Sequence, residues 1–193
     1  MKKLFLPFIL LLGTVGVTQA QKIETKPQTS ADVGMRPIQT GNWMVGGSIG
    51  SLGYSFEGKS FNASINPRAG YFVSDGIAVG AEAMLGLKTL KAPQENDWRY
   101  GIAPFVRYYF PEGASSTGRF FGQGSVGIAG SSLGDGATFT AGANLGYAHF
   151  ITQTVALEAT FGYNYSKANV SGADKSTGLG FGVGFQIYLP GKR

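Results

Sequence analysis

The sequence predicts an all-β protein, an eight-stranded antiparallel up-and-down transmembrane β-barrel with a small and polar filled lumen. Three observations predict this fold. Apolar residues alternate with small or polar residues over long segments, which is the period-2 pattern of a strand with two different faces. The 31 glycines among 193 residues are about twice the usual fraction of ~7%, and 14 phenylalanines and 9 tyrosines accompany them. Short and longer connections alternate between the segments, as in barrels that cross a membrane.

The alternation is plainest from Asn66 to Leu87, where two alternating runs flank the tight-turn sequence Ser74-Asp75-Gly76. A three-residue turn places Arg68 directly across from Glu82, on the small or polar face of the hairpin. Two opposite charges in register indicate that this face is enclosed and that its charges compensate one another.

The whole chain contains eight such segments, including the two of this hairpin. Each is long enough to cross a bilayer, for which a tilted strand needs about 9 to 11 residues. We expect strands at about 42–52, 60–73, 77–88, 97–110, 119–130, 137–151, 155–166 and 177–189. The connections after the second, fourth and sixth segments are turns, and those after the others are polar and mostly longer.

The chain begins with the pattern of a secretory signal peptide. Two lysines precede an apolar run that ends in Thr18-Gln19-Ala20, so residues 1–20 are expected to be removed by cleavage after Ala20. The alternative, a membrane anchor, needs about 20 apolar residues, and this run is shorter. Residues 21–40 hold two prolines and no periodicity, which predicts a flexible periplasmic segment before a barrel domain at 41–193. The sequence has no cysteine, which excludes disulfides and thiolate metal sites.

The apolar face is expected to point outward. It is too bulky for the lumen of eight strands, whose interior only just accommodates side chains, and its aromatic residues fall at the strand ends, as expected for the two interfaces of a membrane. The same alternation with the apolar face inside would give an exported soluble ligand-binding barrel. The predicted belt at the turn side consists of Trp43, Tyr71, Tyr108, Phe110, Phe120 and Tyr147. The predicted belt at the loop side consists of Trp98, Tyr100, Phe139, Tyr163 and Tyr165.

Several segments together resemble the small outer-membrane β-barrels of Gram-negative bacteria, the OmpX-like and OmpA-transmembrane-like "porin family" barrels. These segments are NPRAGYFVSDGIAVGAEA, APFVRYYFPEG, NLGYAHFITQTVALEATFGYNY and GLGFGVGFQIYL. The resemblance implies location in the bacterial outer membrane and contact with the barrel-assembly machinery during biogenesis. It implies an assembly signal at Gly184, Ile187 and Leu189, where Leu189 stands in place of the usual aromatic residue and residues 190–193 extend beyond it.

A set of charged residues is expected in the lumen: Arg68, Glu82, Arg99, Arg107 and Glu158. Such charges could form a selectivity filter, but eight strands leave no aqueous channel, so a structural network is favoured. An unpaired buried arginine is costly. We therefore expect Arg68 to pair with Glu82, and Arg107 or Arg99 to lie near Glu158.

Little in the sequence indicates catalysis or cofactor binding. His149 is the single histidine, no serine lies within two positions of it, and it is interpreted as an interfacial residue rather than a catalytic base. Clustered metal ligands, nucleotide-binding motifs and the basic clusters of nucleic-acid-binding proteins are absent from the sequence. No cofactor, metal or nucleic acid is expected.

The sequence thus predicts a non-enzymatic outer-membrane barrel, a structural scaffold with a closed lumen that displays its loops. A narrow porin-like channel for small solutes is the alternative. Lysines at or near the predicted loops could lie against lipopolysaccharide phosphates, or they could be merely solvated. These lysines are Lys59, Lys88, Lys91, Lys167 and Lys175.

Overall fold

The computed structural model describes residues 29–55, 60–89, 96–111, 115–133, 136–169 and 175–191. A short 3-10 helix, η2 (Arg36–Ile38), precedes the sheet. The strands are β1 (Trp43–Ser55), β2 (Ser60–Ser74), β3 (Ile77–Lys88), β4 (Asp97–Tyr109), β5 (Gly118–Ser131), β6 (Thr138–Phe150), β7 (Val155–Ala168) and β8 (Lys175–Leu189). The predicted signal peptide, its cleavage site after Ala20, and two of the predicted loop lysines, Lys59 and Lys91, lie outside the described residues.

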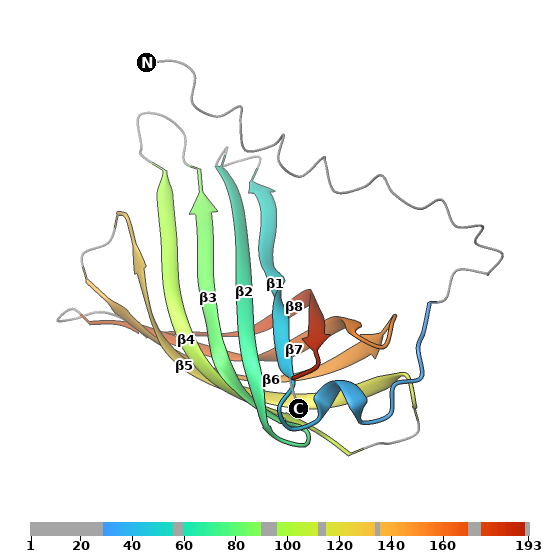
Figure 1. Ribbon diagram of the computed structural model, residues 1–193. Helices are drawn as coiled ribbons and strands as arrows, with labels where there is room; N and C mark the ends of the chain where they lie inside the picture. Colours follow the sequence, from blue (N-terminus) through green and yellow to red (C-terminus); the bar gives the residue numbers. More distant parts are fainter. Residues whose placement is uncertain are drawn as a thin grey trace, which may run out of the picture.

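The eight strands form one closed antiparallel barrel in sequence order. β8 pairs with β1 from Trp43↔Leu189 to Ile49↔Val183, which joins the two edges of the sheet. Strands β1 to β4 stand upright in Figure 1, and β5 to β8 cross behind them, as expected where the strands of a barrel tilt strongly against its axis. The predicted all-β fold is confirmed, and the predicted strands match the observed ones to within three residues at each end.

The barrel has two different ends. The connections β2–β3, β4–β5 and β6–β7, together with η2 and the start of β1, lie at one end, which we call the turn end. The opposite ends of the strands, where β1, β3, β5 and β7 finish and β2, β4, β6 and β8 begin, form the other end of the barrel, which we call the loop end. The β2–β3 turn is tight because Gly76 adopts a φ of 75°, a left-handed conformation that glycine reaches without strain.

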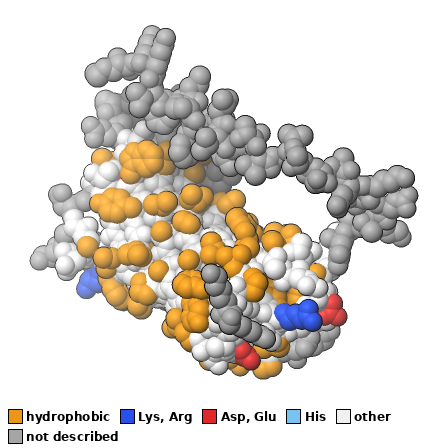
Figure 2. All heavy atoms as spheres, in the orientation of Figure 1, with side chains coloured by type: hydrophobic (Ala, Val, Ile, Leu, Met, Phe, Trp, Pro, Cys, Tyr) orange, Lys and Arg blue, Asp and Glu red, His pale blue; other side chains and the backbone are white. Residues whose placement is uncertain are grey.

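The two faces of the sheet differ as the alternation predicts. On β4, the outward residues Ile102 and Val106 are 53% and 55% exposed, whereas the inward Arg107 is fully buried. Figure 2 shows apolar side chains spread over the outer surface, with charged side chains at its edges. The apolar face therefore points away from the lumen on every strand.

The segment before β1 differs from the expected flexible lead-in over residues 29–41. Ala31, Val33 and Ile38 are buried, with exposed fractions of 3%, 4% and 0%. The segment carries too few apolar residues to show a period, but these three side chains pack on the turn end of the barrel. We refer to residues 29–41 as the N-terminal strap. No helix among the described residues is long and apolar enough to span a bilayer.

Candidate functional site

The lumen contains a charged layer contributed by β2, β3, β4 and β7. Arg68 Nη2 lies 2.8 Å from Glu82 Oε2, because the hairpin register places these two residues directly opposite each other. Glu158 bridges two arginines, with its Oε1 2.6 Å from Arg107 Nη1 and its Oε2 3.5 Å from Arg68 Nη1. Two positive and two negative side chains thus form one compensated cluster, which we call the ionic layer.

Arg107 is the centre of this layer. Its Nε donates to Gln123 Oε1 at 2.9 Å, and its Nη1 donates to the Tyr109 hydroxyl at 3.0 Å. Its guanidinium carbon lies 4.0 Å from the centroid of the Phe121 ring, a cation–π distance. A fully buried guanidinium with this many partners is a structural element of the lumen, since its charge has no contact with solvent.

Arg99 lies apart from the ionic layer, although the sequence placed it there. It pairs with Asp97 at 2.9 Å near the loop end, and its side chain is 63% exposed. The two residues are two positions apart on β4 and therefore share a face. That spacing was available in the sequence and is the signal that could have identified the pair.

Below the ionic layer, toward the turn end, aromatic side chains fill the lumen. Five rings from five strands approach one another with centroid separations of 5.2 to 6.4 Å between neighbours. Each is at most 1% exposed. They are Phe72, Tyr109, Phe121, Phe150 and Tyr188. We call this set the aromatic plug.

The aromatic plug was not predicted as a unit. All five residues occupy inward positions near the turn-side ends of their strands, and this shared position is the signal that could have revealed them. Gly146 makes room for one ring, because a Cβ at this position would collide with the Phe121 side chain. The hydroxyls of Tyr109 and Tyr188 lie 2.8 Å apart and connect the plug to Arg107.

The N-terminal strap packs against the plug and is hydrogen-bonded to residues in or next to all three turns. The amide of Ala31 donates to Phe150 O at 2.9 Å, and the amide of Gly76 donates to Ile38 O at 2.8 Å. Arg119, which the sequence analysis did not identify, donates through Nη2 to Gly34 O and through Nη1 to Ser115 O, at 2.8 and 2.9 Å. The strap therefore closes the turn end of the barrel and is held there by these hydrogen bonds.

One contact of the strap involves a titratable side chain, the carboxyl group of Asp75. Asp75 Oδ1 accepts hydrogen bonds from the Thr40 amide and the Thr40 hydroxyl, both at 2.8 Å. The Thr40 amide, and then its hydroxyl, lower the pKa of this carboxyl below its usual value. A lowered pKa stabilises the docked strap above the ordinary carboxyl pKa, and this contribution is lost as pH falls through the lowered value.

We expect the hydrogen-exchange protection factor of the Thr40 amide to be constant near neutral pH and to fall as Asp75 is protonated in acid. Asp75→Asn should give low protection at every pH, because a neutral amide is a weaker acceptor than a carboxylate. Hydrogen exchange measured by NMR, corrected for the intrinsic rate at each pH, checks this. An acid loss of protection that is equally large in Asp75→Asn would contradict it.

His149 lies close to a serine that sequence spacing did not reveal. Its Nε2 is 3.1 Å from Ser30 Oγ and also 3.1 Å from Thr29 O. A protonated Nε2 donates to the Thr29 carbonyl, and an unprotonated Nε2 accepts from the Ser30 hydroxyl. The Thr29 contact competes with any role of His149 as a base toward Ser30, because it requires a proton on Nε2, and both contacts fasten the strap to the end of β6.

The loop-end half of the lumen holds a cavity of about 820 Å³. The ionic layer forms its floor, where Arg68 and Glu82 line it, and Lys88 and Arg99 line it toward the loop end. Its wall is built mainly of small, hydroxyl-bearing and amide-bearing side chains, such as Asn144. The lumen is therefore filled from the ionic layer to the turn end and hollow above that layer.

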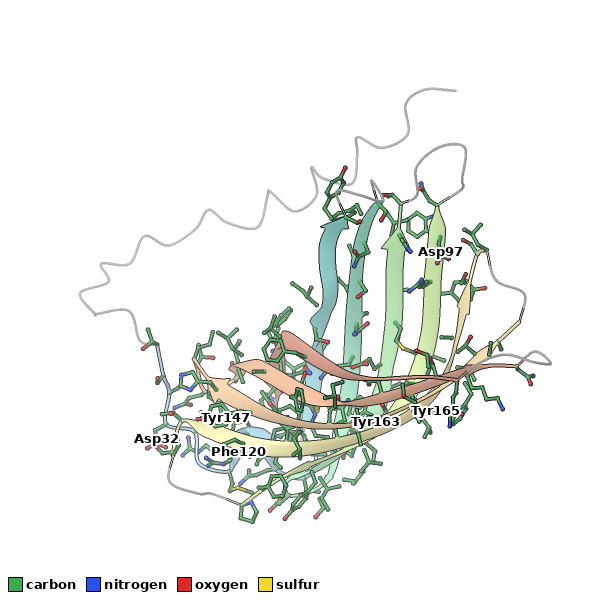
Figure 3. All side chains as sticks on the ribbon, turned by 180° about the vertical axis from the view of Figure 1, so that it is seen from behind. Asp32, Asp97, Phe120, Tyr147, Tyr163 and Tyr165 are labelled. Atoms are coloured by element: carbon green, nitrogen blue, oxygen red, sulfur yellow. The ribbon has the colours of Figure 1, made fainter. Side chains whose placement is uncertain are left out.

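The predicted belts lie on the outer face, where Tyr147 and Tyr165 are half-buried and the other nine aromatic side chains are exposed. Several contact one another, as in the pair Phe120–Tyr147, with centroids 4.8 Å apart. Phe120 and Tyr147 lie at one end of the barrel in Figure 3, and Tyr163 and Tyr165 lie further toward the loops.

The residues proposed as an assembly signal lie on the closing strand, β8. Ile187 and Leu189 point outward and are 36% and 46% exposed. Gly184 points inward, where a Cβ would collide with the backbone of β1. Within the described part of the chain, histidines and carboxylates form no group that could hold a metal ion.

Comparison with known proteins relates this chain to solved structures. Neisserial surface protein A (NspA) is 19% identical, with 76% of this chain and 94% of that chain covered and a TM-score of 0.51. Outer membrane protein OprG from Pseudomonas aeruginosa is 12% identical, with 79% and 97% covered and a TM-score of 0.50. No family model matches the chain, and no curated protein matches it. At these identities the likeness concerns the fold, and the chain has the fold of these small barrels.

Proposed function

We propose that this chain is a non-enzymatic, non-conducting barrel of the bacterial outer membrane that serves as a structural scaffold and displays its four loops. The observation that carries the proposal is the combination of an apolar outer surface with a lumen closed at the turn end. The fold shared with NspA and with the outer membrane protein OprG supports this location.

The outer surface suits hydrocarbon rather than water. Large apolar side chains such as Leu145, Leu179 and Phe181 are 64%, 72% and 67% exposed. Soluble monomers rarely expose continuous apolar patches larger than a few hundred Å², and here such side chains occur on all eight strands. An exported soluble ligand-binding barrel would need the opposite orientation of the sheet.

The closed turn end argues against passage of solutes. A solute entering at the loop end would reach the ionic layer, then the aromatic plug, and then Ile38 of the strap, which is 0% exposed. The charges of the layer are compensated within it, so the layer has no net charge with which to select an ion. A narrow channel for small solutes is the second candidate, and the loop-end cavity of about 820 Å³ is the observation that favours it.

Conductance separates the two candidates. We expect the refolded full chain in planar bilayers to give no discrete current steps above background. Tyr188→Ala, which removes one ring of the plug, serves as a comparison. Current steps that pass through the lumen should become larger in this variant, whereas background leakage should not change. Reproducible steps from the unaltered protein would overturn the scaffold proposal in favour of a channel.

Location is tested separately by cell fractionation. The protein should remain with outer membranes after carbonate washing, because an embedded barrel is held by burial of its outer surface rather than by charge. Recovery in the aqueous periplasmic fraction would contradict the proposed location.

A further inference from the structure

Two lysines carry charge on the outward face of the described strands. Among the described strand residues, the outward positions carry no aspartate, glutamate or arginine, and their lysines are Lys167 on β7 and Lys175 on β8. These two residues are direct cross-strand partners, and both are exposed. No described carboxylate lies within 4.0 Å of either one. Like charges directly opposite each other destabilise a sheet, so the pair favours an anion between its ammonium groups.

An apolar groove lies beside this pair on the same outer face. Its volume is about 610 Å³, and it crosses β4 to β7. The small outward residues Pro104, Gly124, Ala141 and Ala143 line it together with Val106 and Val126, and Tyr163 and Tyr165 line the β7 side.

The groove and the lysine pair are adjacent along β7. Outward positions on a strand are two residues apart, about 6.6 Å, so Lys167 follows directly after Tyr165 toward the loop end. Phe139, the cross-strand partner of Lys167, lies 6.5 Å from the Tyr165 ring, measured between ring centroids. A molecule seated here meets two positive charges at the loop end and an apolar trough toward the middle of the barrel.

We propose that this surface is a specific lipid site for the lipid A part of lipopolysaccharide, with a phosphate on Lys167 and Lys175 and an acyl chain in the groove. The inference rests on the proposed outer-membrane location, in which the loop end faces the outer leaflet. The paired ammonium groups match a phosphomonoester, which carries between one and two negative charges near neutral pH. A phosphodiester headgroup carries a single charge and matches one lysine.

Native mass spectrometry of the refolded full chain in a neutral detergent, titrated with lipid A, tests the site. The double variant Lys167→Gln/Lys175→Gln should weaken binding roughly 25-fold, from about fivefold per lysine at a membrane surface. Lys88→Gln removes the same charge from the inward face of the same end and should leave binding unchanged. Phosphatidylglycerol, a phosphodiester lipid, should bind more weakly than lipid A and respond less to the double variant.

A second variant tests the groove independently of charge. A Cβ at Gly124 would meet no atom within 4 Å, so a side chain can leave the backbone there without collision, and Gly124→Leu places an isobutyl group in the trough. It should weaken lipid A binding several-fold while both lysines remain. Unchanged binding in both variants, or equal affinity for phosphatidylglycerol, overturns the site. If the unaltered protein inserts into vesicles and resists carbonate extraction in that case, the proposed function stands, whereas failure to insert counts against the function itself.

Discussion

Replacing Glu158 with glutamine is expected to lower the free energy of unfolding by about 3 to 5 kcal/mol, the usual cost of leaving a buried charge without its partner. Glu158 lies 2.6 Å from Arg107 and 3.5 Å from Arg68. Glutamine keeps the shape of the side chain but supplies no negative charge. Arg107 would then be a fully buried cation without its paired carboxylate, although Gln123, Tyr109 and the Phe121 ring still contact it.

Two variants make the Glu158 prediction specific. Glu82→Gln should cost less, because Glu82 faces the loop-end cavity and Arg68 keeps Glu158. Arg99→Gln removes an ion pair whose arginine is 63% exposed, and such pairs contribute about 0 to 1 kcal/mol. Urea unfolding of the refolded protein in lipid vesicles, followed by tryptophan fluorescence, gives the three values. A Glu158→Gln effect no larger than that of Arg99→Gln would show that the ionic layer does not stabilise the barrel.

The strands could be predicted because each one shows its own alternation of apolar and small or polar residues. A barrel strand with lipid on one side and a packed lumen on the other must alternate at period 2, and that pattern needs no knowledge of distant residues. The pairing of Arg68 with Glu82 was equally accessible, since a tight turn fixes the register of its hairpin. The position of Glu158 was not accessible to the same degree, because it meets Arg68 across 90 residues of sequence.

The aromatic plug and the strap escaped prediction for a different reason. An inward phenylalanine near a strand end, such as Phe72, interrupts the small-residue pattern and resembles an isolated exception. Its role in the plug can be recognised only in the folded barrel, where five strands bring five such aromatic residues to one level of the lumen. The strap has no period at all, and Ile38 is buried because of what lies beneath it rather than because of its own neighbours in sequence.

Tyr188→Ala is expected to lower the free energy of unfolding by about 3 to 5 kcal/mol, the range for large aromatic residues removed from a packed core. The Tyr188 ring is 1% exposed and lies between the rings of Phe72, Tyr109 and Phe150, with centroids 5.2 to 6.4 Å away. Alanine would leave a cavity in the buried cluster that contains the five rings of the plug, and it would remove the hydroxyl partner of Tyr109.

The two parts of the Tyr188 effect can be separated on the same strand. Tyr188→Phe keeps the ring and loses only the hydroxyl contact, so it should cost about 1 kcal/mol, because Tyr109 still receives a hydrogen bond from Arg107. Phe181→Ala removes a ring of similar size from the outer face, where it is 67% exposed, and should cost clearly less than Tyr188→Ala. Urea unfolding in vesicles measures all three. If Phe181→Ala proves as costly as Tyr188→Ala, the lumen is not the packed core of this barrel. The plug would then close the turn end without contributing to its stability.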